Sequence, residues 1–100
     1  MSISSTRDVE DYLRKNKNLF YNKFGVIRIG LFGSFVLGQQ TRSSDIDIIV
    51  EFEKHRKNIH NFLGLKRFLE QELGRKVDLG VVGSLKPPVK EKVERQILYV

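Results

Sequence analysis

The sequence contains no cysteine and no long apolar run, and neither an internal repeat nor a low-complexity segment stands out. Without cysteine, disulfides and thiolate metal sites are excluded. No stretch approaches the ~20 consecutive apolar residues that a membrane-spanning helix needs. Residues 1–10 lack the basic start and apolar core of a signal peptide. We therefore expect a cytoplasmic protein with no membrane partner.

The composition predicts one small folded unit. Of 100 residues, 40% are hydrophobic and 30% are charged, which fits a single domain, 1–100, with a small core. The net charge of +6 comes from 18 Lys and Arg against 12 Asp and Glu. A basic chain can bind nucleic acid, an acidic protein or nucleotide phosphates, or can simply be well solvated. Because the basic residues are scattered and no nucleic-acid-binding motif is present, we expect no nucleic-acid partner.

Hydrophobic periodicity and turn residues predict alternating helices and strands. The first helix is capped by Ser5 or Thr6 and ends near Gly25, with Leu19 or Phe20 on its apolar face. Segments 39–44 and 53–61 are expected to be loops. The expected elements are helix 6–24, strand 26–32, short helix 35–38, strand 45–52, helix 62–73, strand 77–82 and a helix opened by Pro88 that buries Val89, Val93 and Ile97. This order predicts an α/β layer structure with about three strands.

Three aspartates interrupt apolar strands. Alternation along strand 45–52 places Asp45 and Asp47 on one face, about 6.5–7 Å apart, and Asp78 lies near the start of another strand. A lone carboxylate is costly to bury, and a bound cation would offset that cost. Mg²⁺ prefers carboxylate, phosphate and water oxygens, and two such ions can serve one phosphoryl transfer. The alternative is that Asp-x-Asp is a solvated strand face and that Asp78 simply begins a strand.

A glycine-serine turn, Gly33-Ser34, ends the strand that precedes these aspartates. Glycine lets the backbone approach a phosphate, and backbone N–H groups at the start of the short helix that follows attract anions. The Ser34 hydroxyl could donate to a phosphate oxygen, and Arg42 and Ser44 could add contacts to the phosphates or to an acceptor. Taken alone, Gly-Ser is a common turn.

The combined spacing resembles a known family. Gly33-Ser34, ten further residues and Asp45-Ile46-Asp47 are similar to the signature of the polymerase-beta-like nucleotidyltransferases. The strings LFGSFVLG and SSDIDIIV resemble its smallest members, the minimal nucleotidyltransferases. VDLG at 77–80 resembles the segment that holds the family's third carboxylate, and LKPPVKEKVERQILYV resembles its last helix. The resemblance covers residues 26–100.

This resemblance implies a fold, a reaction and roles for the residues. The fold is a small mixed sheet of about three strands flanked by helices, α/β (α+β) in class. The reaction transfers a nucleoside monophosphate, expected to come from ATP, with loss of pyrophosphate. Asp45 and Asp47 would hold two Mg²⁺ ions. Asp78 would complete one metal site and could accept the proton of the acceptor hydroxyl. Gly33 and Ser34 would hold the β- and γ-phosphates.

The resemblance also implies a partner. Minimal members are commonly paired with a helical HEPN protein in a toxin–antitoxin module, and some attach AMP to a tyrosine of that toxin. We therefore expect an antitoxin that adenylylates a HEPN-type toxin encoded nearby. Two alternatives stay open: an antitoxin with a weak site that acts by binding alone, and a transferase for a small molecule such as an aminoglycoside. The missing acceptor domain counts against the second alternative.

Other candidate residues have simpler interpretations. His55 and His60 are spaced i, i+5, which is not a helical metal pair, so we expect exposed loop histidines. The basic stretch 54–57 could contact a nucleotide or an acidic partner, but solvated charges are the simpler expectation. Tyr12 and Tyr99 could lie in a subunit interface or in the core, and the sequence leaves both open.

Overall fold

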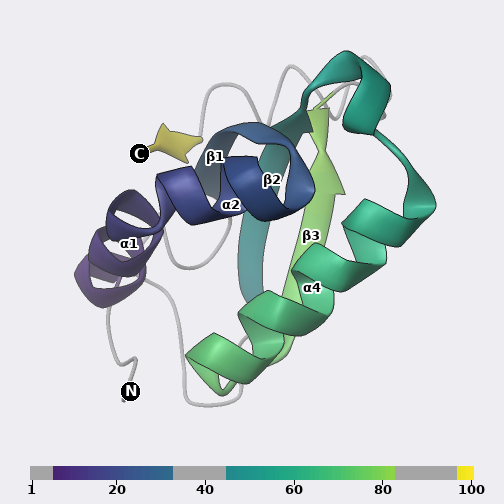
Figure 1. Cartoon of the computed structure of the whole chain (residues 1–100). Helices are drawn as coiled ribbons and strands as arrows, with labels where there is room; N and C mark the ends of the chain where they lie inside the picture. The colour runs from purple at the N-terminus through teal and green to yellow at the C-terminus, as the bar shows by residue number, and fades with distance from the viewer. Residues whose placement is uncertain (1–5, 33–44, 83–96) are drawn as a thin grey trace.

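A mixed four-stranded sheet, with strands in the order β3-β2-β1-β4, forms the centre of the molecule (Figure 1). The computed structural model describes residues 6–32, 45–82 and 97–100. The central strand β1 pairs antiparallel with β2 and β4, and β2 pairs parallel with β3. The strands are β1 (Val26–Phe32), β2 (Ile46–Phe52), β3 (Val77–Val81) and β4 (Leu98–Tyr99).

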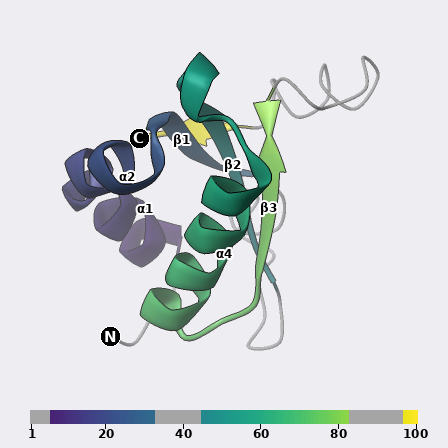
Figure 2. The ribbon, with the colours of Figure 1, turned by 45° about the vertical axis from the view of Figure 1, so that its right-hand side comes forward.

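The helices α1 (Thr6–Lys15), α2 (Lys17–Phe24) and α4 (Ile59–Leu73) pack against one face of this sheet (Figure 2). Alternate residues of β2 point toward these helices, as the sequence pattern predicted, and so do Val77 and Leu79 of β3. Burying these side chains is the main favourable contribution to folding. The strand residues in this core are Val26, Ile29, Leu31, Ile46, Ile48, Val50, Phe52, Val77 and Leu79. The predicted α/β class is confirmed.

The first helix is broken at Asn16, so the prediction of one continuous helix is wrong. The Asn16 backbone N–H donates to the Leu13 carbonyl at 3.2 Å, and the Asn16 side-chain amide donates to the Tyr12 carbonyl at 2.8 Å. Asparagine side chains compete for backbone groups in this way and end helices. The break lets α1 bury Leu13 and α2 bury Phe20, whereas Leu19 is 40% exposed.

Tyr12 lies in the core, where it joins α1 to α4. Its hydroxyl donates to Glu72 Oε1 at 3.3 Å. Burial raises the pKa of Tyr12 above its ordinary value, and the nearby Glu72 carboxylate raises this pKa further. Packing within the chain therefore explains why Tyr12 is buried, and no subunit interface is needed.

Arg56 closes the end of α2 from a distant part of the chain. It belongs to the short helix η1 (Lys54–Arg56), within a segment that the sequence predicted to be loop. Its guanidinium donates to the carbonyls of Tyr21 and Asn22 at 2.7 and 2.9 Å. The last carbonyls of a helix have no partner inside the helix, and a cation satisfies them well. Arg56 is therefore a helix cap rather than one more solvated charge.

The helix α4 begins three residues earlier than the sequence indicated. The Asn58 side chain accepts a 2.8 Å hydrogen bond from the Asn61 N–H, which is a standard N-cap interaction. The predicted apolar stripe is confirmed, because Leu65, Leu69 and Leu73 are all buried. The helix ends at Gly74 with φ +66°, in the left-handed conformation that glycine adopts without strain.

We expect Asn58→Ala to lower the free energy of unfolding by about 1 kcal/mol, since the mutation leaves the first turn of α4 without its cap. Chemical denaturation followed by circular dichroism measures this loss. Asn58→Asp serves as the control, because aspartate can accept the same hydrogen bond and should keep most of the stability. Equal loss in both variants would contradict the capping role.

The closing segment contains β4, which the sequence did not predict. Leu98 and Tyr99 pair with Leu31 and Gly30 of β1, and Ile97 precedes this strand instead of lying in the expected last helix. A two-residue strand has too little pattern to be recognised without its partner. The short helix at 35–38 and most of the helix after Pro88 lie outside the described residues. Among the helices that the structure describes, none has the length and apolar character to cross a membrane.

Candidate active site

The parallel pairing of β2 with β3 brings two of the predicted aspartates together. Asp47 lies directly opposite Asp78 in this register. Neighbouring strands are about 4.7–4.9 Å apart, so these backbones hold the two carboxylates as close neighbours. Both residues alternate with core residues and therefore lie on the sheet face turned away from α1, α2 and α4, which we call the carboxylate face. Asp47 is half-buried and Asp78 is exposed.

Asp45 lies one position before β2 and is exposed. The N–H of the next residue, Ile46, donates to the Lys76 carbonyl at 3.0 Å, which fixes this end of β2 beside β3. In the ranges 6–32, 45–82 and 97–100, no three His, Cys, Asp or Glu side chains are grouped closely enough to hold a metal ion. The described structure thus brings Asp47 beside Asp78, and the three-carboxylate metal set stays a prediction.

The other half of the predicted site adjoins the same end of the sheet in sequence. Phe32, the last residue of β1, pairs with Asp47, and Gly33 follows it in the chain. The predicted phosphate-binding residues, Gly33, Ser34, Arg42 and Ser44, lie outside the described residues, so their roles stay predictions.

The carboxylate face also carries a charged group that sequence reasoning did not single out. Arg28 of β1 lies opposite Glu51 of β2, with their side chains 3.6 Å apart. The Arg28 guanidinium lies over the Tyr99 ring, 4.1 Å from its centroid, and this contact ties β4 to β1. The period-2 pattern places Glu51 on this face, but the pairing with Arg28 depends on strand register, which the sequence does not reveal.

The two histidines lie apart from this end of the sheet. His55 and His60 are both exposed, and His55 Nε2 lies 3.6 Å from Glu53 Oε1. Both histidines follow the C-terminal end of β2, whereas Asp47 lies at its N-terminal end. Their exposure matches the sequence interpretation, although His55 lies in η1 and His60 in α4 rather than in a loop.

Comparison with known proteins shows which protein family the chain belongs to. Residues 10–100 match the nucleotidyltransferase domain family. A Methanocaldococcus jannaschii protein assigned as a protein adenylyltransferase, MJ1379, is 41% identical over 98% of this chain and its own full length. The protein adenylyltransferase MntA of Thermococcus cleftensis is 37% identical over the full length of both chains. The chain belongs to the nucleotidyltransferase domain family, and the resemblance seen in the sequence is confirmed.

Solved structures agree in fold. A protein assigned as a minimal nucleotidyltransferase superposes with a TM-score of 0.82 and 28% identity, over 98% of both chains. A toxin–antitoxin structure with AMP-PNP superposes with a TM-score of 0.70 and 26% identity, over 85% of this chain and 69% of that one. The minimal nucleotidyltransferase fold is therefore shared along nearly the whole chain.

Proposed function

We propose that this protein is a Mg²⁺-dependent protein adenylyltransferase. In this proposal it transfers AMP from ATP to a tyrosine hydroxyl of a partner HEPN toxin and thereby acts as an antitoxin. The observation that carries the proposal is the pairing of Asp47 with Asp78 on one face of the sheet, in a chain of the nucleotidyltransferase family. The similar protein from Thermococcus cleftensis is a protein adenylyltransferase, and a structure of similar fold is a toxin–antitoxin with AMP-PNP.

The carboxylates suit the proposed metal. Two carboxylates held side by side on rigid strands repel each other, and a divalent cation between them removes that repulsion. Oxygen donors of this kind match Mg²⁺. Asp45, Asp47 and Asp78 would hold the metal, which supplies positive charge where the transferred phosphate becomes more negative. Gly33, Ser34, Arg42 and Ser44 would contact the phosphates.

The proposed reaction exchanges one phosphorus–oxygen bond for another. The acceptor hydroxyl oxygen bonds to the α-phosphorus of ATP, and the bond from that phosphorus to the α,β-bridging oxygen breaks. AMP is then esterified to the acceptor, and pyrophosphate leaves with the bonding electron pair. The proton of the hydroxyl passes to the Asp78 carboxylate, which is exposed to solvent and so can pass it on. Positioning and charge stabilisation carry most of such a reaction.

We expect the protein to add AMP to the product of its neighbouring gene. The two proteins are incubated with ATP and Mg²⁺, and intact mass spectrometry measures the gain of AMP units on the partner. Two ATP analogues show which phosphorus is attacked. AMP-PNP keeps the α,β-oxygen bridge and should still donate AMP, whereas an analogue with an α,β-methylene bridge should not.

The other outcomes are equally informative. Inhibition of the partner without any mass gain would overturn the adenylyltransferase proposal and favour an antitoxin that acts by binding. Gain of a single phosphate from ATP would mean attack at the γ-phosphorus and a different reaction. Replacing the modified tyrosine of the partner by phenylalanine should remove the label at that position.

A further inference from the structure

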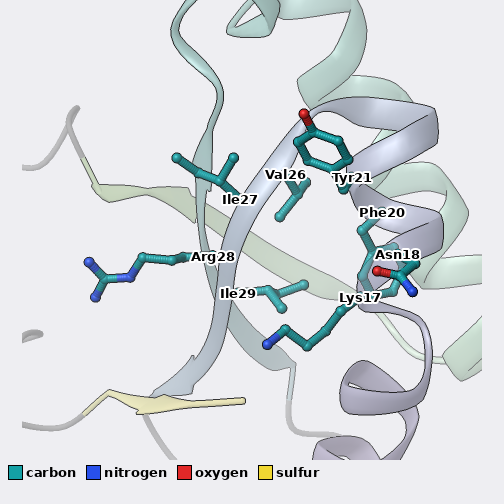
Figure 3. A pocket seen from close by; sticks show the side chains of 8 residues that line it. All are labelled: Lys17, Asn18, Phe20, Tyr21, Val26, Ile27, Arg28 and Ile29. Atoms are coloured by element: carbon teal, nitrogen blue, oxygen red, sulfur yellow. The ribbon is translucent and has the colours of Figure 1, made fainter.

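A groove between α2 and β1 lies apart from the carboxylate face. It has a volume of about 330 Å³ and is lined by the apolar side chains of Phe20, Val26, Ile27 and Ile29, among others. In Figure 3, Val26 and Ile29 project from β1 toward α2, and Lys17 reaches from α2 toward Ile29. Such a groove is large enough for one or two aliphatic side chains of a ligand.

Three exposed apolar residues lie on the two elements that border this groove. Leu19, Tyr21 and Ile27 have exposed fractions of 40%, 43% and 46%, and two of these three residues line the groove. Among the described residues, two other large hydrophobic side chains are exposed, Ile59 at 70% and Leu63 at 47%, and both lie on α4. Exposed apolar residues that gather around a concavity are typical of an interaction surface.

The backbone beside the groove is a strand edge. The strand β4 pairs with β1 only at Gly30 and Leu31, and the Val100 N–H extends this contact to the Ile29 carbonyl at 3.1 Å. Within the described part of the chain, no strand pairs with the outer edge of β1 from Val26 to Arg28. A bulge at this point, between Val26 and Arg28, also interrupts the pairing with β2. An extended peptide can pair with an edge of this kind.

Two basic side chains flank the edge, and one of them, Arg28, also lies 3.6 Å from Glu51 of β2. Lys17 lines the groove on one side of β1, and Arg28 points away on the other side (Figure 3). The residues that line the groove include no acidic side chain. In an added strand, alternate side chains would face the groove and the Arg28 side in turn. A second copy pairing through the same edge would bring Arg28 and Lys17 close to their own equivalents, which like-charge repulsion disfavours.

We propose that the outer edge of β1 and the groove beside it bind an extended segment of a partner protein in which apolar and acidic residues alternate. The apolar side chains enter the groove, the acidic ones lie on the Arg28 side, and the backbone pairs with the outer edge of β1. Lys17, on the groove side, adds a longer-range attraction for the acidic segment. The groove of this docking site opens on the helical side of the sheet, and of the docking residues only Arg28 belongs to the carboxylate face. It does not depend on the protein being an adenylyltransferase.

A synthetic peptide tests the site directly. A fluorescein-labelled seven-residue peptide that alternates Glu with Val should bind the protein, and fluorescence anisotropy measures the dissociation constant. Lys17→Glu should weaken this binding at least about fivefold, because an attractive charge becomes a repulsive one. This variant should fold well, since Lys17 is exposed at the start of α2, where an acidic residue is favourable. Arg67→Glu, an exposed reversal on α4, is the matched control and should change binding less than about twofold.

Two further measurements separate strand pairing from simple charge attraction. In ¹⁵N spectra, the peptide should shift the amide signals of Ile27 and Arg28 and slow the hydrogen exchange of Ile27. A peptide of the same sequence with N-methylated alternate amides should lose this protection. A Lys-Val alternating peptide should bind more weakly than the Glu-Val peptide.

Several results would overturn the proposal. One is the absence of binding by the Glu-Val peptide at ~1 mM peptide. Another is that Lys17→Glu and Arg67→Glu weaken peptide binding equally. A third is that a single-stranded oligonucleotide binds at the same residues more tightly than the peptide does. Concentration-dependent dimerisation that is abolished by Ile27→Asp but not by Ile59→Asp would assign the edge to a second copy instead.

Discussion

Replacing Asp47 by asparagine is expected to reduce AMP transfer at least about a hundredfold, because the proposed site then loses one negative charge where cations must be held. Asparagine has nearly the same shape, so strand pairing between β2 and β3 should persist. Asp78→Asn should have a comparable effect, since Asp78 is the register partner of Asp47. Initial rates of AMP incorporation into the partner, at saturating ATP, measure both variants.

The matched control lies on the same strand and the same face. Glu51→Gln also converts a carboxylate to an amide, but Glu51 pairs with Arg28 rather than with Asp78. Its effect on transfer should stay within about twofold, as for other exposed ion pairs. If Glu51→Gln and Asp47→Asn reduce transfer equally, the decisive factor is the charge of the whole face and not a metal site.

A second readout tests the metal role without activity. Titration with Mn²⁺, followed by electron paramagnetic resonance, should show weaker binding to Asp47→Asn and Asp78→Asn than to the parent protein. The double variant Asp45→Ala plus Asp47→Ala should abolish transfer and remain folded, as judged by circular dichroism. Unfolding of the double variant, together with unchanged Mn²⁺ affinity of the asparagine variants, would show that the aspartates are structural.

Gly25→Ala is expected to lower the free energy of unfolding by about 3 kcal/mol, which is more than the strain of a left-handed alanine alone. Gly25 has φ +79°, and a Cβ at this position would lie 2.6 Å from the Arg56 Cβ. Alanine would therefore impose left-handed strain and also displace the Arg56 side chain from the carbonyls of Tyr21 and Asn22. Urea denaturation at neutral pH measures the loss.

Gly74 provides the comparison that isolates the Arg56 contact. It also ends a helix in the left-handed conformation, with φ +66°, but nothing lies within 4 Å of a Cβ built there. Gly74→Ala should therefore cost only about 1 kcal/mol, from backbone strain alone. If both alanine variants lose the same stability, Arg56 moves aside freely and contributes little at this position.

The sequence was sufficient wherever local patterns decide the structure. Alternation along 45–52 assigned Asp47 and Ile48 to opposite faces correctly, and helical spacing identified the buried stripe of Leu65, Leu69 and Leu73. Positive-φ glycine at the end of a helix was also predictable at Gly74. These features depend on interactions between residues that are near one another in the chain.

Features that depend on distant partners could not be predicted. The break at Asn16 is a local exception, because its side chain bonds the Tyr12 carbonyl four residues back, and the pattern does not distinguish this from an asparagine that faces solvent. The role of Arg56 depends on α2, which is more than thirty residues away. For the site, spacing identified Asp47 and Asp78 as candidates, but their pairing follows from the parallel order of β2 and β3, which the sequence leaves open.

In the described ranges 6–32, 45–82 and 97–100, the three α-helices share one side of the sheet, and this affects how such a protein can change. Residues that stabilise the fold point toward α1, α2 and α4, whereas Asp47, Asp78 and Arg28 belong to the other side of the same strands. Neighbouring residues in β2 are therefore under separate selective pressures, one for the amount of folded protein and one for the transfer reaction. A saturation mutagenesis screen should show expression lost at Ile46, Ile48 and Val50, and also at Ile49, which is fully buried on the carboxylate face. At Asp47, transfer alone should be lost.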